Sequence, residues 1–330
     1  ISETARQVIA QVGYELEDFN AKDCTIMSNI HELPPPGSGQ FSQENFENAD
    51  PDCLTASHPV TTFGFACNQN KAFLPQPIWV AHQLARQLDL VRKQKQLLYL
   101  LADNLTQVSI EYQDRRPQRI HNISLLTSQI SDSDKSHDQV ESDLRESVIE
   151  PVLARLNIDW DLKTKIQINP EGPILGGGPT LHSGLTGRKS AEDTYGQYSR
   201  HSSSALSGKN PNRIERIAPY YARYVAKNVV AAGLADECEI QLSYTVAQSE
   251  PVSIQLDTCG TGKIDDEQIL LRVMDTFDFR VGAIIHAFNL HTLPAKHKNG
   301  YFRQLARYGQ MGRTDLDTPW EQTDKADLLG

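Results

Sequence analysis

The amino-acid sequence predicts an α+β fold in which antiparallel sheets are covered on one face by helices. Strand-like runs come in adjacent pairs, at 107–113 with 119–129 and at 237–247 with 250–258. Helices are expected between these pairs rather than between the two strands of one pair. Neighbouring strands that are joined without a helix pair antiparallel, so this order argues against a doubly wound parallel sheet.

The expected helices rest on apolar residues at helical spacing and on residues that favour helix ends. The first begins directly at the start of the chain, with one apolar face made of Ile1, Ala5, Val8, Ile9 and Val12. Further helices are expected at 76–95, 137–157, 219–232 and 266–278, and one further strand at 164–169. Pro151 is expected to kink the end of its helix, and Pro219 to begin the helix that Gly233 follows.

Composition narrows the class of protein. The 330 residues are 39% hydrophobic and 22% charged, with a formal net charge of -10, which is typical of a soluble globular chain with more than one domain. An acidic balance predicts no general affinity for nucleic acid, and no run approaches the roughly 18 apolar residues of a membrane helix. The five cysteines form no C-x-x-C pair, which favours the reducing cytoplasm.

The stretch 31–52 is rich in Pro, Gly, Ser and Asn and predicts a loop or linker. It places a domain boundary near residue 50. Because the first helix begins at Ile1 without a lead-in, we expect a further segment to precede it in the whole protein, so the lack of a signal peptide is uninformative.

Two stretches have the residue types that bind anions. In GGGPTLHSGLTGRKSAEDTYG (176–196), a glycine-rich turn allows backbone N–H groups to approach an anion, and Arg188 and Lys189 supply positive charge. An ordinary solvated loop explains this stretch equally well. The ten histidines show no metal-ligand spacing, and no nucleophile elbow is present.

The second stretch is RHSSSALSGKN (200–210) and the residues after it. It is not a P-loop, because Ser203 and Asn210 replace the glycine and hydroxyl that the motif requires. Lys209 and Arg213 nevertheless lie near a predicted helix start, where the dipole favours anions, and Glu215 could bind a magnesium ion. The alternative is a charged helix face with local salt bridges.

Several motifs together resemble the S-adenosylmethionine synthetase family. They are GLTGRK (184–189), DTYG (193–196), ALSGK (205–209), ARYVAKNVVAAGLA (222–235) and PWEQTDKADLL (319–329), and they occur in the family's order. The resemblance implies three pseudo-symmetric domains, with a remnant of the first at 1–49, a central domain at 50–172 and a C-terminal domain at 173–330. It also implies a homodimer or tetramer with active sites between subunits.

The family converts ATP, L-methionine and water to S-adenosylmethionine, phosphate and pyrophosphate, assisted by Mg²⁺ and K⁺. The resemblance assigns ATP or polyphosphate binding to five residues of this sequence, which are Asp103, Arg188, Lys189, Lys209 and Arg213. Glu215 stands where the family has a magnesium-binding aspartate.

Other family positions are substituted. His58 replaces an acidic residue, Leu105 a catalytic lysine, and His182 a methionine-binding aspartate. Leu33 replaces a glutamine on the methionine side, and Ile174, after Pro173, part of an adenine-binding pair. The SEGHPDK segment, with a catalytic histidine, is expected upstream of Ile1. We therefore expect impaired methionine binding and little or no synthetase activity.

Three hypotheses remain open at this point. The chain is a divergent synthetase, a non-catalytic paralogue that keeps the dimer fold and polyphosphate binding, or an adenosyltransferase with a different second substrate.

Overall fold

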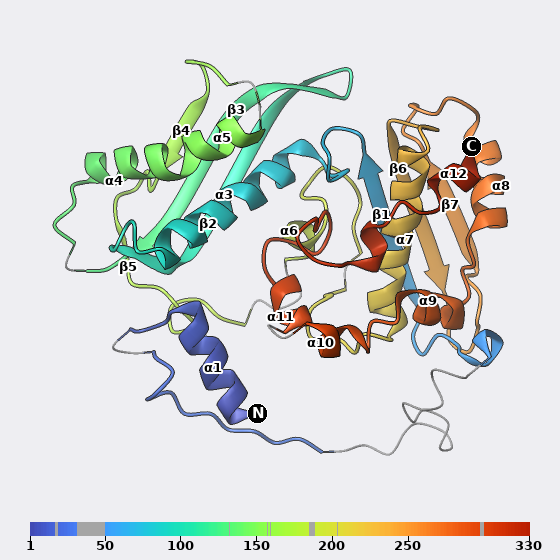
Figure 1. The fold of residues 1–330 in the computed structure, drawn as a ribbon, viewed down its shortest axis with the longest axis horizontal. Coiled ribbons are helices and arrows are strands. Elements are labelled where there is room, and N and C mark those ends of the chain that lie inside the picture. The colour runs from blue at the N-terminus through green and yellow to red at the C-terminus, as the bar shows by residue number, and fades with distance from the viewer. Residues whose placement is uncertain are drawn as a thin grey trace. The chain divides into compact units, whose positions relative to one another are not determined.

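The computed structural model describes residues 1–16, 19–31, 50–131, 133–156, 158, 160–184, 189–202, 204–297 and 300–330. The chain divides into two compact units, one formed by 1–34 with 80–184 and the other by 35–79 with 185–330. Each unit combines a sheet with helices (Figure 1), and the predicted α+β class is confirmed.

The first unit is built around a four-stranded sheet. Long strands β2 (Leu100–Gln113) and β3 (Arg116–Gln129) form an antiparallel pair, and β4 (Lys165–Ile168) and β5 (Ile174–Leu175) both pair with β3 in parallel. The parallel pairing differs from the antiparallel order expected from the sequence. The chain crosses through helices between β3 and β4, and such a crossover returns the next strand in the same direction.

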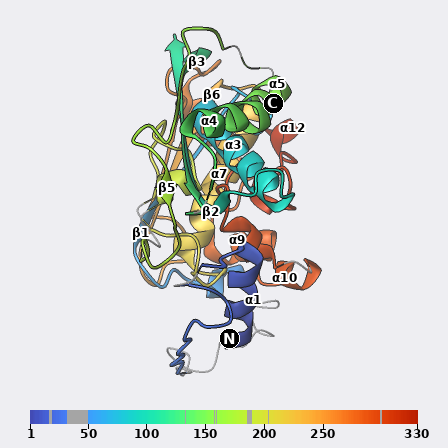
Figure 2. The same ribbon diagram turned by 90° about the vertical axis from the view of Figure 1, so that its left-hand side faces the viewer.

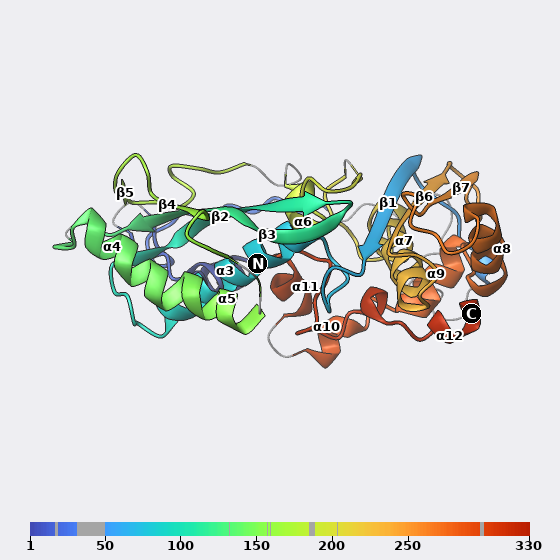
Figure 3. The same cartoon turned by 90° about the horizontal axis from the view of Figure 1, so that it is seen from above.

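Helices cover one face of this sheet, as Figure 3 shows. They are α3 (Gln76–Lys93), α4 (His137–Leu144) and α5 (Glu150–Leu156), and their apolar residues share one buried core with the strands. The helix α1 (Ser2–Val12) is attached to this unit by Arg92, whose guanidinium donates to the carbonyl of Val12 at 2.8 Å.

Pro151 affects the turn before it. The residues Arg145–Ile149 form a π-helical turn, in which the amide of Glu150 reaches back to the carbonyl of Arg145. Proline has no N–H and its ring crowds the preceding turn, so a widened turn relieves the crowding and lets the helix continue.

The second unit contains an antiparallel three-stranded sheet in the order β1 (Val60–Cys67), β6 (Glu237–Tyr244) and β7 (Ser253–Asp257). The long helix α7 (Ile214–Ala231) packs against β1 and β6 (Figure 2). The other helical elements are η1 (Pro51–Cys53), α6 (Ser190–Asp193), α8 (Asp266–Thr276), α9 (Val281–Phe288), α10 (Leu293–Lys296), α11 (Tyr301–Leu305), η3 (Pro319–Glu321) and α12 (Ala326–Leu329).

The start of α7 differs from the expectation. The helix begins at Ile214, five residues before Pro219, so the proline lies inside it. A proline inside a helix removes one hydrogen bond and strains the preceding turn. Every residue from Ile214 to Val230 is buried, and this packing outweighs the local cost.

In the part of the chain that the structure describes, no helix is both long enough and apolar enough to cross a membrane.

Gly64 allows α7 to lie close to β1. A Cβ atom at this position would stand 2.0 Å from the carbonyl carbon of Ala222 and 2.2 Å from the amide nitrogen of Arg223. Both atoms belong to the helix backbone, so the contact cannot be relieved by a side-chain rotation.

Gly64→Ala should therefore destabilise the second unit by about 3 kcal/mol or more, because strand and helix must move apart. Thermal unfolding followed by circular dichroism measures the change. Thr61→Ala, at an exposed position of the same strand, is the control. Equal melting temperatures for the two variants would contradict the prediction.

Candidate functional site

Three of the predicted site residues meet at the N-terminal end of α7. Lys209 lies in the turn before the helix, Arg213 directly precedes it, and Glu215 is its second residue. The Lys209 ammonium is 3.8 Å from Glu215 Oε1, and Arg213 Nε is 3.5 Å from Glu215 Oε2. The local salt bridges that the sequence offered as the alternative explanation are thus present. They place the Lys209 and Arg213 cations on the same carboxylate, that of Glu215.

His58 joins this group from the segment before β1. Its Nε2 atom is hydrogen-bonded to the Arg213 guanidinium. The sequence identified His58 as a substituted position, but the contact joins residues 155 positions apart and no local pattern signals it.

The helix end itself favours an anion. Arg213 is the N-cap residue of α7 and its extended backbone carries no side-chain cap. The first N–H groups of such a helix point outward with a partial positive charge. Gly208, in the turn before Lys209, has a φ of +82 and open space at its Cβ position, so a ligand can approach the backbone there.

Glu215 has a buried oxygen atom that lacks a hydrogen-bond partner. The side chain is 10% exposed, and Oε2 accepts no hydrogen bond, although it faces Arg213 at ion-pair distance. Buried polar atoms are normally hydrogen-bonded, so this oxygen has the capacity to accept a further bond. Within the described ranges, no group of three His, Cys, Asp or Glu side chains gathers to hold a metal ion. A magnesium ion at Glu215 would therefore need phosphate and water oxygens as its other ligands, which is common for this ion.

In the other basic stretch, 176–196, the structure describes residues 176–184 and 189–196, and Arg188 lies outside the described residues. The Lys189 ammonium is 3.4 Å from Glu192 Oε1, and its side chain is 48% exposed. Lys189 is thus available to a ligand at the cost of one exposed ion pair, which contributes little to stability. The structure shows no direct contact between its side chain and Lys209.

Asp103 belongs to the first unit and has partners there. The hydroxyl of Tyr14 donates to Asp103 Oδ1 at 2.6 Å, and the amide of Gly178 donates to Oδ2. A Cβ atom on Gly177 would crowd Asp103 Oδ2, so a larger residue there would displace this carboxylate. Asp103 therefore connects the glycine-rich turn to Tyr14, two residues after the end of α1. The sequence predicted Asp103 as a binding residue, and Tyr14 is a partner that it did not indicate.

The other substituted positions are at the surface. Leu105 on β2 is 46% exposed, Ile174 on β5 is 38% exposed, and His182 is exposed in the turn that follows. Leu33 lies outside the described residues.

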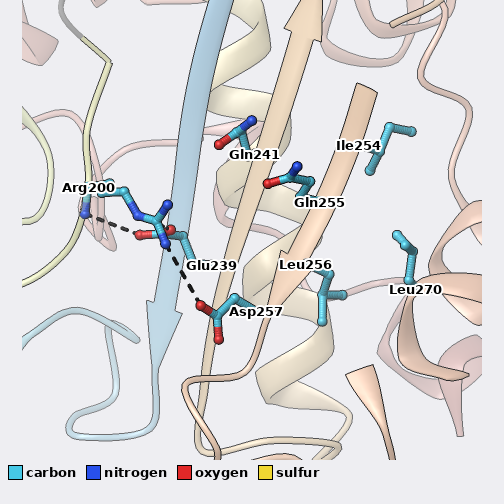
Figure 4. A pocket seen from close by; sticks show the side chains of 8 residues that line it. All are labelled: Arg200, Glu239, Gln241, Ile254, Gln255, Leu256, Asp257 and Leu270. Carbon is cyan, nitrogen blue, oxygen red and sulfur yellow. Dashed lines mark hydrogen bonds and ion pairs between the residues drawn. The ribbon is translucent and has the colours of Figure 1, made fainter. Parts of the chain in front are cut away.

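A surface depression of 390 Å³ lies on the face of the sheet β1-β6-β7 that is turned away from α7 (Figure 4). It is lined by Arg200, Glu239, Gln241, Ile254, Gln255, Leu256, Asp257 and Leu270. Arg200 Nε is 2.8 Å from Glu239 Oε1, and a second guanidinium nitrogen is 3.8 Å from Asp257 Oδ2. Because two carboxylates neutralise its cation and no predicted site residue lines it, this depression is a poor phosphate site.

The fold defines an α+β protein in which Lys209 and Arg213 gather around the buried Glu215 at the start of α7. Comparison with known proteins gives the family. Family models match residues 54–174 as "S-adenosylmethionine synthetase, central domain" and residues 176–322 as "S-adenosylmethionine synthetase, C-terminal domain". The chain belongs to the S-adenosylmethionine synthetase family, which confirms the resemblance found in the sequence.

Relatives named S-adenosylmethionine synthase are similar along almost the whole chain. The protein of Trichormus variabilis is 44% identical over 98% of this chain and 80% of its own length. Those of Microcystis aeruginosa and Synechococcus elongatus are each 44% identical over 98% of this chain and 81% of their own lengths.

Asp193, four residues after Lys189, has an altered acidity. Burial, and to a smaller extent the charge of the neighbouring Glu192, raise the pKa of this carboxyl to about 6. A carboxyl with a raised folded-state pKa contributes stability at low pH that is lost as the pH rises through that value. The unfolding free energy should therefore fall between pH 3.8 and about 6.

Asp193→Asn removes this loss, so the variant should be more stable than the wild type by about 2–3 kcal/mol at pH 7.5 and equally stable below pH ~4. Urea unfolding at both pH values measures the difference. Glu192→Gln, which removes only the smaller cause, should give a smaller gain. A stability difference that does not change with pH would contradict the prediction.

Proposed function

We propose that this chain binds the polyphosphate part of ATP at the N-terminal end of α7. Lys209 and Arg213 contact the phosphate oxygens, and Arg188 and Lys189, in the stretch 176–196, supply further positive charge. The observation that supports this best is the convergence of Lys209 and Arg213 on the buried Glu215 at an uncapped helix end. Asp103 takes part on the nucleotide side.

Glu215 is the proposed magnesium ligand, and its buried Oε2, which accepts no hydrogen bond, fits that role. When bound, Mg²⁺ would neutralise charge on the phosphate oxygens that the two cations also contact. K⁺ is proposed from family membership.

We further propose that residues 1–49 are a remnant of an N-terminal domain, 50–172 a central domain and 173–330 a C-terminal domain. The family matches at 54–174 and 176–322 support this division. A cytoplasmic homodimer or tetramer completes the proposal.

In the family reaction, the methionine sulfur attacks the ribose C5′ and tripolyphosphate leaves. The leaving group carries a high negative charge, so fixed cations lower the barrier. In this chain, Lys209 and Arg213 keep that capacity, while Leu105 brings no charge. His58, at a position where the resemblance places an acidic residue, is hydrogen-bonded to Arg213.

Each lost charge contact to a transition state costs about 2.7–4 kcal/mol, and losses within one site do not simply add. We therefore propose that turnover to S-adenosylmethionine is slow or absent and that polyphosphate binding persists. The synthesis assay below separates a working synthetase from the two alternatives, which are a non-catalytic paralogue and an adenosyltransferase with another second substrate.

Binding of tripolyphosphate is the direct test of the anion site. Isothermal titration in the presence of magnesium should show saturable binding, weakened about tenfold or more by Lys209→Ala and by a smaller factor by Lys189→Ala, which is more exposed. Lys263→Ala, at an exposed position of the same unit, should bind like the wild type. Absence of binding, or binding indifferent to Lys209→Ala, would overturn the proposed site.

Synthesis of S-adenosylmethionine from ATP and L-methionine tests the catalytic part. We expect a rate at least about a hundredfold below that of the Trichormus variabilis protein assayed in parallel, because charged contacts are missing. The double variant Leu105→Lys with His58→Asp should recover part of the difference. A wild-type rate equal to that of the relative would show that the substitutions do not impair the chain.

A further inference from the structure

Gln310 lies at the junction of the two basic stretches. It is fully buried, with 0% of its surface exposed, and each of its polar groups has a partner. The backbone amide and carbonyl pair with Asp193 and Trp320, and the side-chain amide pairs with Ser207 and Tyr220. We infer that Gln310 is a positioning residue that holds the two basic stretches at a set separation, so that the site prefers a polyphosphate chain to a single phosphate.

On one side the contacts lead to Lys209. Gln310 Nε2 donates to the hydroxyl of Ser207 at 2.9 Å, two residues before Lys209. The hydroxyl of Tyr220 donates to Gln310 Oε1 and accepts from Arg216 Nε at 3.3 Å. Arg216 in turn donates to the carbonyl of Lys209 at 2.6 Å. Arg216 and Gln310 thus fix the backbone and Ser207 of the predicted anion-binding turn by hydrogen bonds. The Arg216 guanidinium is used for this contact and is not assigned to the ligand.

On the other side the contacts lead to Lys189. The amide of Gln310 donates to the carbonyl of Asp193 at 2.7 Å, and the amide of Asp193 donates to the carbonyl of Lys189 at 2.9 Å. Thr194 closes the same short turn by donating its hydroxyl to the carbonyl of Ser190 at 2.7 Å. A continuous series of hydrogen bonds therefore connects the backbones of Lys189 and Lys209 through Gln310.

Aromatic rings pack around this junction. The rings of Tyr220 and Trp320 stack with centroids 3.9 Å apart, and Trp320 Nε1 donates to the carbonyl of Gln310 at 2.9 Å. The Arg216 guanidinium lies over the ring of Phe302, 4.5 Å from its centroid. The buried hydrogen bonds among Arg216, Tyr220, Gln310 and Trp320 are costly to break, because the freed groups are poorly solvated.

The consequence concerns the length of the bound anion. A single phosphate can be held by Lys209 and Arg213 alone, so it does not depend on where Lys189 lies. A tripolyphosphate that contacts both stretches binds more tightly when the distance between Lys189 and Lys209 is already fixed. The entropy cost of ordering the two stretches is then part of folding and does not reduce the affinity. This inference rests on the proposed function, because it assumes that both stretches bind one polyphosphate.

The test compares tripolyphosphate with orthophosphate. In Gln310→Leu, the affinity for tripolyphosphate should fall about tenfold or more, while that for orthophosphate changes less than about twofold. Lys209→Ala should lower the affinity for both tripolyphosphate and orthophosphate. Gln255→Leu, an exposed glutamine in the same unit, should change neither. Ser207→Ala removes one partner of Gln310 with little risk to folding and should reproduce the selective loss to a smaller extent.

The possible outcomes separate the two proposals. If wild-type protein binds no tripolyphosphate, the proposed function fails and the inference falls with it. If the wild type binds and both Gln310→Leu and Ser207→Ala weaken the two anions equally, or weaken neither, the inference alone is overturned. A loss confined to tripolyphosphate in folded variants supports it, because a general loss of stability would affect both anions.

Discussion

The second unit depends on a buried ion pair between Arg223 and Glu321. The Arg223 side chain is fully buried and donates to both carboxylate oxygens, at 3.1 and 2.9 Å, and to the carbonyls of Phe65, Ala72 and Phe73. Lys227 adds a bond of 2.8 Å. Burial alone would raise the pKa of Glu321, but the two cations hold it below its usual value. Loss of one partner would leave a buried charge uncompensated, at a cost of about 3–5 kcal/mol.

This ion pair also determines where the C-terminal segment lies. Glu321 accepts a hydrogen bond of 2.7 Å from the amide of Gly312, and its neighbour Trp320 stacks on Tyr220 of α7. Gln310 is thereby placed beside the same helix. The helix α7 thus carries Arg223 of the buried ion pair at its middle and the proposed anion-binding residues at its start. The stability of the unit and the geometry of the candidate site therefore depend on the same helix.

Sequence reasoning reached the candidate site through motifs and residue chemistry. Lys209, Arg213 and Glu215 lie within seven positions of one another, and a cationic turn before a helix is a local pattern. The contacts that organise them are not local. His58 reaches Arg213 across 155 positions, Gln310 reaches Ser207 across 103, and Tyr14 reaches Asp103 across 89. Histidine, glutamine and tyrosine are common in every kind of environment, so their identity alone signals no such role.

The sequence by itself determined the α+β class, the paired strands β2–β3 and β6–β7 and the longer helices α1, α3, α7 and α8 with the run α4–α5, because periodicity and end signals act over a few residues. Tertiary structure decided the rest. The strand β1 was not foreseen, since it forms by pairing with β6 far along the chain and contains Gly64, which a lone strand disfavours. The parallel pairing of β4, the position of Pro219 inside α7 and the junction at Gln310 likewise depend on burial against distant segments, and that burial is absent from any local stretch of sequence.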